Sequence, residues 1–205
     1  MARTDFFATL RQDIGRAYRY QRGGRWRRAA GCLATPGIQA VLVYRFGQWA
    51  RQRSRLLRCL LDPIYWILYT LVRIAWGIAI PRSARIGPGL YIGHFGGITI
   101  SHSAVIGRNC NLSHGITVGV SGHGEECGVP VIGDDVYIAP GACLFGKIVI
   151  GNNAKIGANA VIHKDVPENA VAVMDPGFRV ISHTGNRIVR DLQHPSEPRR
   201  NASTG

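Results

Sequence analysis

The feature of this sequence that most limits its fold is an aliphatic residue that recurs at every sixth position. Neither an α-helix nor an ordinary β-strand has that period. A small residue often follows the aliphatic one, as in Ile86-Gly87 and Ile138-Ala139. This pattern predicts a parallel β-helix, in which each hexapeptide forms one side of a triangular coil and the aliphatic side chain points inward. The recurring residues form three runs: Ile80, Ile86, Ile92 and Ile98; Ile100, Ile106, Leu112 and Val118; and Ile132, Ile138, Leu144, Ile150, Ile156 and Ile162.

The period also predicts which residues are neighbours in successive coils. Three hexapeptides make a coil of about 18 residues, and the phase slips by two after residue 98, so residue 112 should lie on residue 92. His94 and His114 then occupy the same place in successive coils, about 4.8 Å apart. A 14-residue step from 118 to 132 replaces the expected 12. With that step counted, we predict that the column continues to Asp134 and then Asn152.

The same step marks a loop, residues 119–131, that is rich in glycine and carries His123, Glu125, Glu126 and Cys127. Loops that leave a rigid repeat scaffold commonly carry binding groups. We therefore expect this loop to form part of a functional site.

The positive charge of the chain is concentrated at its N-terminus. The formal net charge is +13, and residues 1–80 carry 14 arginines, no lysine and three aspartates, a net +11. Such a segment favours contact with an anionic membrane surface or a phosphorylated acceptor. Nucleic acid is not expected as a partner, because no recognition motif accompanies the charge.

We interpret residues 1–79 as a basic α-helical segment with helices at about 3–20, 36–54 and 56–76. Pro36 suits a first helical turn. The apolar run 64–80 contains Arg73 and is short for a membrane span. We interpret this run as a helix that docks on the β-helix or on a second subunit, and the alternative is a helix lying in a membrane interface.

The five cysteines show neither metal-ligand spacing nor a disulfide framework, which fits a reducing cytoplasm. The first residues lack the apolar core of a signal peptide, so we expect a cytoplasmic protein, with a peripheral position at the inner face of the plasma membrane as a further option. Residues 183–205 are predicted to form a partly disordered C-terminal tail.

Residues 80–182 resemble the hexapeptide-repeat acyltransferases, which are left-handed β-helices. The segments Gly-Leu-Tyr-Ile-Gly-His94-Phe-Gly-Gly and Ser-His114-Gly-Ile-Thr carry the resemblance, which is strongest to serine acetyltransferases and to exopolysaccharide acetyltransferases such as those of colanic acid. The expected fold class is thus mainly β, a left-handed parallel β-helix with an N-terminal α-helical segment. The handedness follows from the resemblance alone.

The resemblance implies transfer of an acetyl group from acetyl-CoA to a hydroxyl. This reaction needs a base for the hydroxyl proton and a donor for the oxyanion. His94 matches the general base of serine acetyltransferases. His114 is a candidate for orienting that base, binding the acceptor or polarising the thioester carbonyl. His123 resembles the loop histidine of galactoside and xenobiotic acetyltransferases, although Gly124 replaces the proline that often follows it.

For acetyl-CoA, the resemblance points to the backbone near Ala139 and Ala158, to His163 and to Lys164, which would face the nucleotide phosphates. Arg179 is a further candidate, but its segment has one residue more than the family pattern. The resemblance also implies a homotrimer, or two trimers joined through the N-terminal segment, with the cofactor between subunits. No metal is expected.

The acceptor is where the sequence departs from serine acetyltransferases. The positions that pair the base and bind serine hold Ala79, Gly93, Gly128 and Val129, and none of them is charged. A serine zwitterion needs charged partners, so we predict a sugar hydroxyl of an exopolysaccharide or its precursor as acceptor, with L-serine as the alternative. Two other classes stay open: a zinc protein like the β-helix carbonic anhydrases, and a non-catalytic membrane-docked scaffold.

Overall fold

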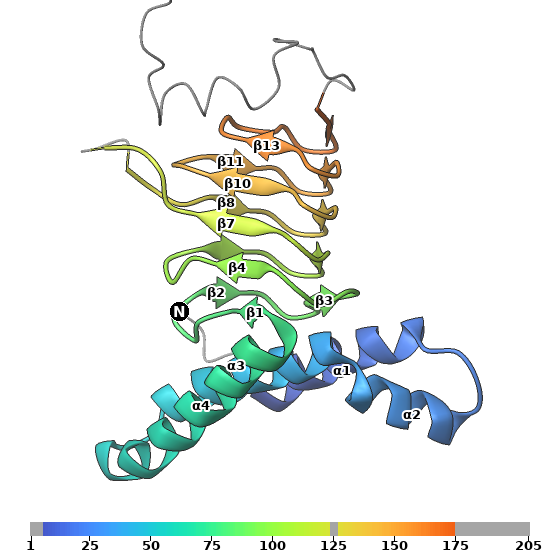
Figure 1. Cartoon of the computed structure of the whole chain (residues 1–205), viewed down its shortest axis with the longest axis vertical. Helices are drawn as coiled ribbons and strands as arrows, with labels where there is room; N and C mark the ends of the chain where they lie inside the picture. The colour runs from blue at the N-terminus through green and yellow to red at the C-terminus, as the bar shows by residue number, and fades with distance from the viewer. Residues whose placement is uncertain (1–5, 124–126, 175–205) are drawn as a thin grey trace, which may run out of the picture. The chain divides into compact units, whose positions relative to one another are not determined.

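The structure, a computed structural model, describes residues 6–123 and 127–174. Four helices precede a series of short strands (Figure 1). The helices are α1 (Phe6–Tyr20), α2 (Arg25–Ala34), α3 (Pro36–Arg51) and α4 (Arg55–Trp76). The strands are β1 (Ile78–Ala79), β2 (Arg85–Ile86), β3 (Tyr91–Ile92), β4 (Ile98–Ile100), β5 (Val105–Ile106), β6 (Asn111–Leu112), β7 (Thr117–Gly119), β8 (Val131–Ile132), β9 (Tyr137–Ile138), β10 (Cys143–Phe145), β11 (Val149–Ile150), β12 (Lys155–Ile156), β13 (Val161–Ile162) and β14 (Val171–Ala172).

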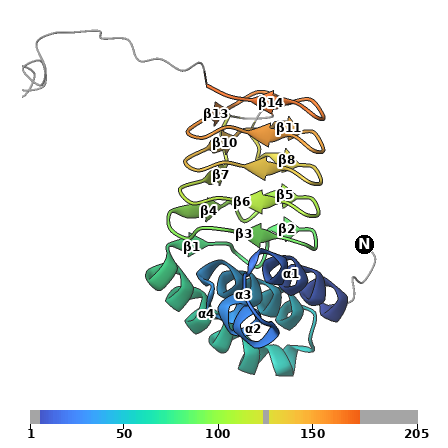
Figure 2. The same cartoon turned by 90° about the vertical axis from the view of Figure 1, so that its right-hand side faces the viewer.

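The strands form three parallel sheets that make the three sides of a β-helix (Figures 1 and 2). Successive strands belong to different sheets, so each strand pairs with strands one coil away. The sheets have the orders β1-β4-β7-β10-β13, β11-β8-β5-β2 and β14-β12-β9-β6-β3. The predicted fold class, a parallel β-helix after a helical segment, is confirmed.

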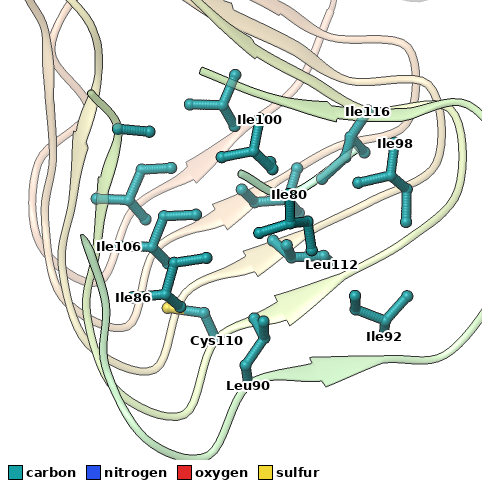
Figure 3. Packing of buried hydrophobic residues seen from close by; sticks show 14 of the residues in the cluster. Ile80, Ile86, Leu90, Ile92, Ile98, Ile100, Ile106, Cys110, Leu112 and Ile116 are labelled. Carbon is teal, nitrogen blue, oxygen red and sulfur yellow. The ribbon is translucent and has the colours of Figure 1, made fainter. Parts of the chain in front are cut away.

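The core of the β-helix consists of the aliphatic residues that define the six-residue period. Figure 3 shows side chains such as Ile86, Ile106 and Leu112 pointing into the interior from different coils. Each of the recurring residues from Ile80 to Ile156 is buried, and Ile162 near the last coil is partly buried. A second buried residue on each side, two positions before the periodic one, completes the close-packed interior, as Leu90, Cys110 and Ile116 do in Figure 3.

Left-handed backbone at the corner between the second and third sheets lets the chain turn there. Asn109, Asp135, Asn153 and Asn169 take φ values between 55° and 62°, and Gly89 takes 79° at the equivalent place in the first coil. Asparagine, aspartate and glycine are the residues that tolerate this conformation best. The positions of these residues in the sequence therefore mark this corner in each coil.

The helical segment differs from the prediction in one element. The predicted helices at 3–20, 36–54 and 56–76 correspond to α1, α3 and α4, with Pro36 in the first turn of α3 as expected. Helix α2 was not predicted, because Gly23, Gly24 and Gly31 weaken the helical pattern around it. The additional helix matters for the site, as its C-terminal end lies beside the histidines.

The helices cover the first coil and satisfy its exposed strand edge. The Tyr44 hydroxyl donates to the Ala84 carbonyl at 2.8 Å and accepts from the Ile86 amide at 3.1 Å. Arg45 donates to the carbonyls of Ile86 and Gly87 at 2.8 and 2.6 Å. An uncovered edge strand would present these groups to other chains, so the helical segment protects the end of the β-helix.

Asp13 of α1 binds the same coil at residues 89 and 90 and also pairs with Arg45. Its carboxylate accepts hydrogen bonds from the Gly89 and Leu90 amides at 2.7 and 3.0 Å and pairs with Arg45 at 2.8 Å. Asp13 is fully buried and Arg45 is 3% exposed. We call Asp13, Tyr44 and Arg45 the edge latch.

Candidate functional site

The two histidines singled out from the sequence are neighbours. Residue 92 of β3 pairs with residue 112 of β6, as the period predicted. His94 and His114 each follow two residues later, and their ring centroids lie 5.7 Å apart with the rings nearly perpendicular. Both side chains are exposed at the surface of the β-helix. The predicted juxtaposition of the two imidazoles is thus confirmed.

The continuation of their column differs from the prediction. Leu112 pairs with Ile138, not with Ile132, so His114 is followed in the next coil by Pro140 and then by Ala158. The backbone bond from the Gly141 amide to the His114 carbonyl, 3.0 Å, fits this register. The 119–131 loop is inserted between β7 of the first sheet and β8 of the second sheet. The prediction paired residue 112 with residue 132, which lies in the second sheet, and so assigned the residues after the loop to the wrong side of the coil. We call the line His94, His114, Pro140 and Ala158 the histidine edge.

Asp134 and Asn152 belong to another corner. Ile132 pairs with Ile106 and Ile150, which places Asp134 between Arg108 and Asn152. The Asp134 carboxylate accepts from the Arg108 amide at 2.7 Å, and the Asp134 amide donates to Asn152 Oδ1 at 2.8 Å. These residues stabilise a turn, and the prediction that they lie beside the histidines is wrong.

A pocket of about 540 Å³ lies in front of the two histidines, between the β-helix and the helical segment. The β-helix contributes Gly93, His94, Phe95 and His114, and the α2–α3 turn contributes Gly31, Ala34, Thr35 and Pro36. Sequence reasoning missed the second group, since nothing local in residues 31–36 marks them as functional. Their position depends on how the helices pack on the first coil.

Hydrogen bonds and ring contacts hold this pocket wall in place. The Thr35 hydroxyl donates to the Gly31 carbonyl at 2.8 Å and accepts from Gln21 at 3.2 Å. On the other side, the Trp76 ring meets the Phe95 ring edge-on, with centroids 5.5 Å apart. The pocket is therefore bounded by α2, α3 and the β-helix, and Trp76 of α4 supports its wall through Phe95.

The pocket lining is neutral apart from the two imidazoles. Its other residues carry no carboxylate, ammonium or guanidinium group. Such a lining suits an uncharged acceptor, and a charged acceptor would need partners from outside this set. Within residues 6–123 and 127–174, no group of three or more His, Cys, Asp or Glu side chains is arranged to hold a metal ion.

The residues proposed for acetyl-CoA divide between two corners. Ala158, which is exposed, lies on the histidine edge, and Ala139, which is buried, lies next to it. His163 and Lys164 follow β13 and are exposed at the corner where the first sheet ends. His123 belongs to the loop that leaves from the same corner, because β7 precedes it. Arg179 lies outside the described residues, as do Glu125 and Glu126.

Two positions tied to acceptor choice have different surroundings. A Cβ atom on Gly93 would lie 3.2 Å from the Tyr91 ring, so a small shift of that ring would make room for a side chain. A Cβ on Gly128 would lie 2.7 Å from Cβ and 3.0 Å from Cα of Lys147. Gly128 therefore leaves no free space for an acceptor, because Lys147 fills the space beside it.

Ala79, the third of these positions, lies in β1 and pairs with Thr99, which in turn pairs with Thr117. These three residues form a line on the outer side of the first sheet. The line contains an alanine and two hydroxyl groups but no carboxylate. Val129 lies at the end of the loop and is partly buried.

Comparisons with known proteins show which proteins this chain resembles. The sequence profile of the family described as "Bacterial transferase hexapeptide (six repeats)" matches residues 130–164. A serine acetyltransferase of Bacillus licheniformis is 32% identical over 94% of this chain and 86% of its own length. One of Synechococcus elongatus is 35% identical over 81% of this chain, which spans 65% of the length of that relative.

Solved structures show the same fold with ligands. The serine acetyltransferase of Neisseria gonorrhoeae in complex with serine has a TM-score of 0.66 and 28% identity, covering 85% of this chain and 68% of its own. A serine acetyltransferase in complex with CoA has a TM-score of 0.67 and 26% identity, covering 87% and 71%.

Proposed function

Because this chain belongs to the serine acetyltransferase family, we propose that it transfers an acetyl group from acetyl-CoA to the hydroxyl group of an acceptor. The observation that carries the proposal is the pair His94 and His114 at the mouth of a 540 Å³ pocket. An imidazole near neutral pH is well suited to remove the proton of an attacking hydroxyl.

We assign the general base to His94 and a positioning role to His114. In the transfer, the base takes the acceptor proton while the hydroxyl oxygen attacks the thioester carbon, and the coenzyme A thiolate then leaves and accepts a proton. His114 lies edge-on to His94 and faces the same pocket, so it is placed to orient the base or the acceptor.

The histidine edge offers a path for the pantetheine arm of acetyl-CoA. Successive coils are about 4.8 Å apart, so Ala158 lies about 10 Å from the level of His114. The small, exposed side chain of Ala158 leaves room for the arm along this edge, whereas the amide and carbonyl of buried Ala139 are already bonded to Ile156 and Ala142. Exposed Lys164 would supply charge for the nucleotide phosphates.

This division of residues between two corners supports a homotrimer. In one chain, His94 and Ala158 lie at one corner, whereas His123, His163 and Lys164 lie at another. A groove between adjacent subunits would bring one corner of one chain to a different corner of the next and would exclude water from the thioester. We assign the assembly to the cytoplasm, where acetyl-CoA is produced.

For the acceptor, the comparisons support L-serine better than the sugar predicted from the sequence. The relatives are named serine acetyltransferases, and one of the similar structures holds serine. A sugar hydroxyl remains the second candidate because of the neutral pocket lining and of Ala79, Gly93, Gly128 and Val129, which offer serine no charged partner.

The test measures coenzyme A release from acetyl-CoA by the purified full-length chain. L-serine is compared with free hexoses and with a glycolipid extract of the source organism. Saturable turnover of L-serine establishes the first candidate, and turnover of a sugar alone establishes the second. Release with none of these acceptors, from protein that binds acetyl-CoA, would contradict both.

A further inference from the structure

Helix α4 is apolar on two opposite sides, and only one of them is covered. Tyr65 and Val72, two turns apart, are buried on the side that faces the rest of the protein. The other side carries large apolar side chains that are between 36 and 84% exposed: Leu56, Leu57, Leu60, Ile64, Ile67, Leu68, Leu71 and Ile74. We call these eight residues the outer face of α4. Figure 2 shows α4 at the periphery of the helical layer.

The outer face contains no charged residue. At 100° per residue, the four charged residues of α4 lie beside it or behind it. Arg55 and Arg73 are 18 residues apart, which is five turns, so both lie on one line along the helix, about 100° around it from the nearest residues of the outer face, and both are exposed. An apolar face with arginine on the adjoining polar side is typical of helices that lie in a membrane interface.

The acidic residue of α4 does not weaken this pattern. Asp62 pairs with Arg82 at 2.6 Å and with Arg58 at 3.9 Å, on the side toward the protein. The hydrogen bond from Arg82 is the main reason that the pKa of Asp62 is lowered, so this carboxylate stays ionised and paired. No negative charge of α4 therefore faces outward.

Charge decides between a lipid surface and a second copy of the chain as the occupant. Residues 1–80 carry a net +11, and Arg51, Arg53 and Arg55 cluster where α4 begins. Two such segments packed face to face would repel each other, whereas anionic lipid headgroups would attract each of them. The electrostatics thus favour an anionic membrane.

Packing decides how the helix meets that membrane. By length and composition α4 could cross a bilayer, and 11% of its most apolar window is buried in the protein. However, Tyr65 stacks on Tyr69, and its hydroxyl oxygen accepts a hydrogen bond from the Arg82 amide at 3.1 Å, so one side of α4 is fixed to the protein. The helix also ends at Gly77, directly before β1. A helix attached along its length can lie on a bilayer but cannot span it alone.

We propose that the outer face of α4 docks this protein on anionic lipid bilayers, with the helix lying in the interface and the flanking arginines contacting headgroups. This property is independent of the acetyl transfer proposed above, so either can fail without the other.

Vesicle co-sedimentation of the full-length protein tests the proposal. Binding to mixed phosphatidylcholine–phosphatidylglycerol vesicles should be at least about tenfold tighter than to phosphatidylcholine alone. Ile67→Asp and Ile74→Asp should each weaken binding to the mixed vesicles about tenfold or more. Val171→Asp, on the exposed surface of β14, adds the same charge and should change binding less than about twofold. Equal binding of all variants would overturn the proposal.

Cys59 gives a second measurement that needs no change on the outer face. It is exposed on α4 between the line of Arg55 and Arg73 and the outer face, and Cys127 in the loop is also exposed. An environment-sensitive fluorophore on Cys59, in a Cys127→Ser background, should shift to the blue on mixed vesicles. The same label on Cys127, in a Cys59→Ser background, should not shift. An unchanged Cys59 signal would overturn the proposal.

Light scattering without vesicles distinguishes the competing occupant. The aspartate variants should keep the oligomeric state and the thermal unfolding profile of the unchanged protein. If Ile67→Asp dissociates the oligomer and the unchanged protein ignores both vesicle types, the outer face is a subunit interface and the lipid proposal is wrong.

Discussion

Removing the carboxylate of the edge latch should destabilise the junction between the helices and the β-helix more than most single substitutions. In Asp13→Asn the Arg45 guanidinium loses its buried counter-ion, and the Asn amide would point a donor at the Arg45 Nε that now donates at 2.8 Å. Breaking a buried pair from one side costs about 3–5 kcal/mol. The new oxygen can still accept from the Gly89 and Leu90 amides.

Asp13→Leu should cost more, because it also leaves those two amides without an acceptor. Each orphaned backbone group adds about 1–3 kcal/mol, and the two are not strictly additive. The double variant Asp13→Leu/Arg45→Met removes both charges, yet it leaves the Gly89 and Leu90 amides and the Ile86 and Gly87 carbonyls unpaired. We therefore expect the double variant to stay less stable than the unchanged protein.

The assay is urea unfolding at one fixed subunit concentration, since association contributes to stability. All four tryptophans lie in residues 1–80, so their fluorescence follows the helical segment while circular dichroism follows the whole chain. A lowered midpoint with an unchanged slope reports a pure change in stability. A double variant with the stability of the unchanged protein would refute the argument that the latch satisfies the strand edge.

The remaining predictions concern the site and two titratable groups. His94→Ala should lower the rate of acetyl transfer about 10²- to 10⁴-fold and retain coenzyme A affinity. His114→Asn should lower the rate less and change its dependence on pH. Normal turnover of His94→Ala would contradict the assignment. Burial is the main cause that raises the pKa of Tyr44 to about 12, so the folded state holds this proton more tightly than the unfolded state does. The stability of the fold should therefore fall between about pH 10 and 12. Tyr44→Phe should flatten that fall in a pH series of unfolding midpoints. Burial likewise raises the pKa of the Cys110 thiol to about 11, so alkylation at pH 8 with mass analysis should label exposed Cys59 well before Cys110.

Contacts between the first two coils could be predicted from the sequence because a β-helix is nearly one-dimensional. Each side repeats at a fixed interval, so the positions of Ile92 and Leu112 fix the neighbours His94 and His114 without knowledge of the rest of the chain. For the same reason the aliphatic residues of the period could be assigned to the core. The basic segment and its helices at 36–54 and 56–76 also follow from local composition and periodicity.

The tertiary structure decided everything that depends on where an irregular segment is inserted or how the helices pack. The side of the coil from which the 119–131 loop departs sets whether His114 is followed by Pro140 or Asp134, and the loop length alone does not reveal it. The α2–α3 turn reaches the pocket only because the helices fold back on the first coil. Lys147 fills the space beside Gly128 through a contact between residues distant in sequence. Periodicity is a property of neighbouring residues in the chain, whereas these contacts arise from surfaces that meet only after folding.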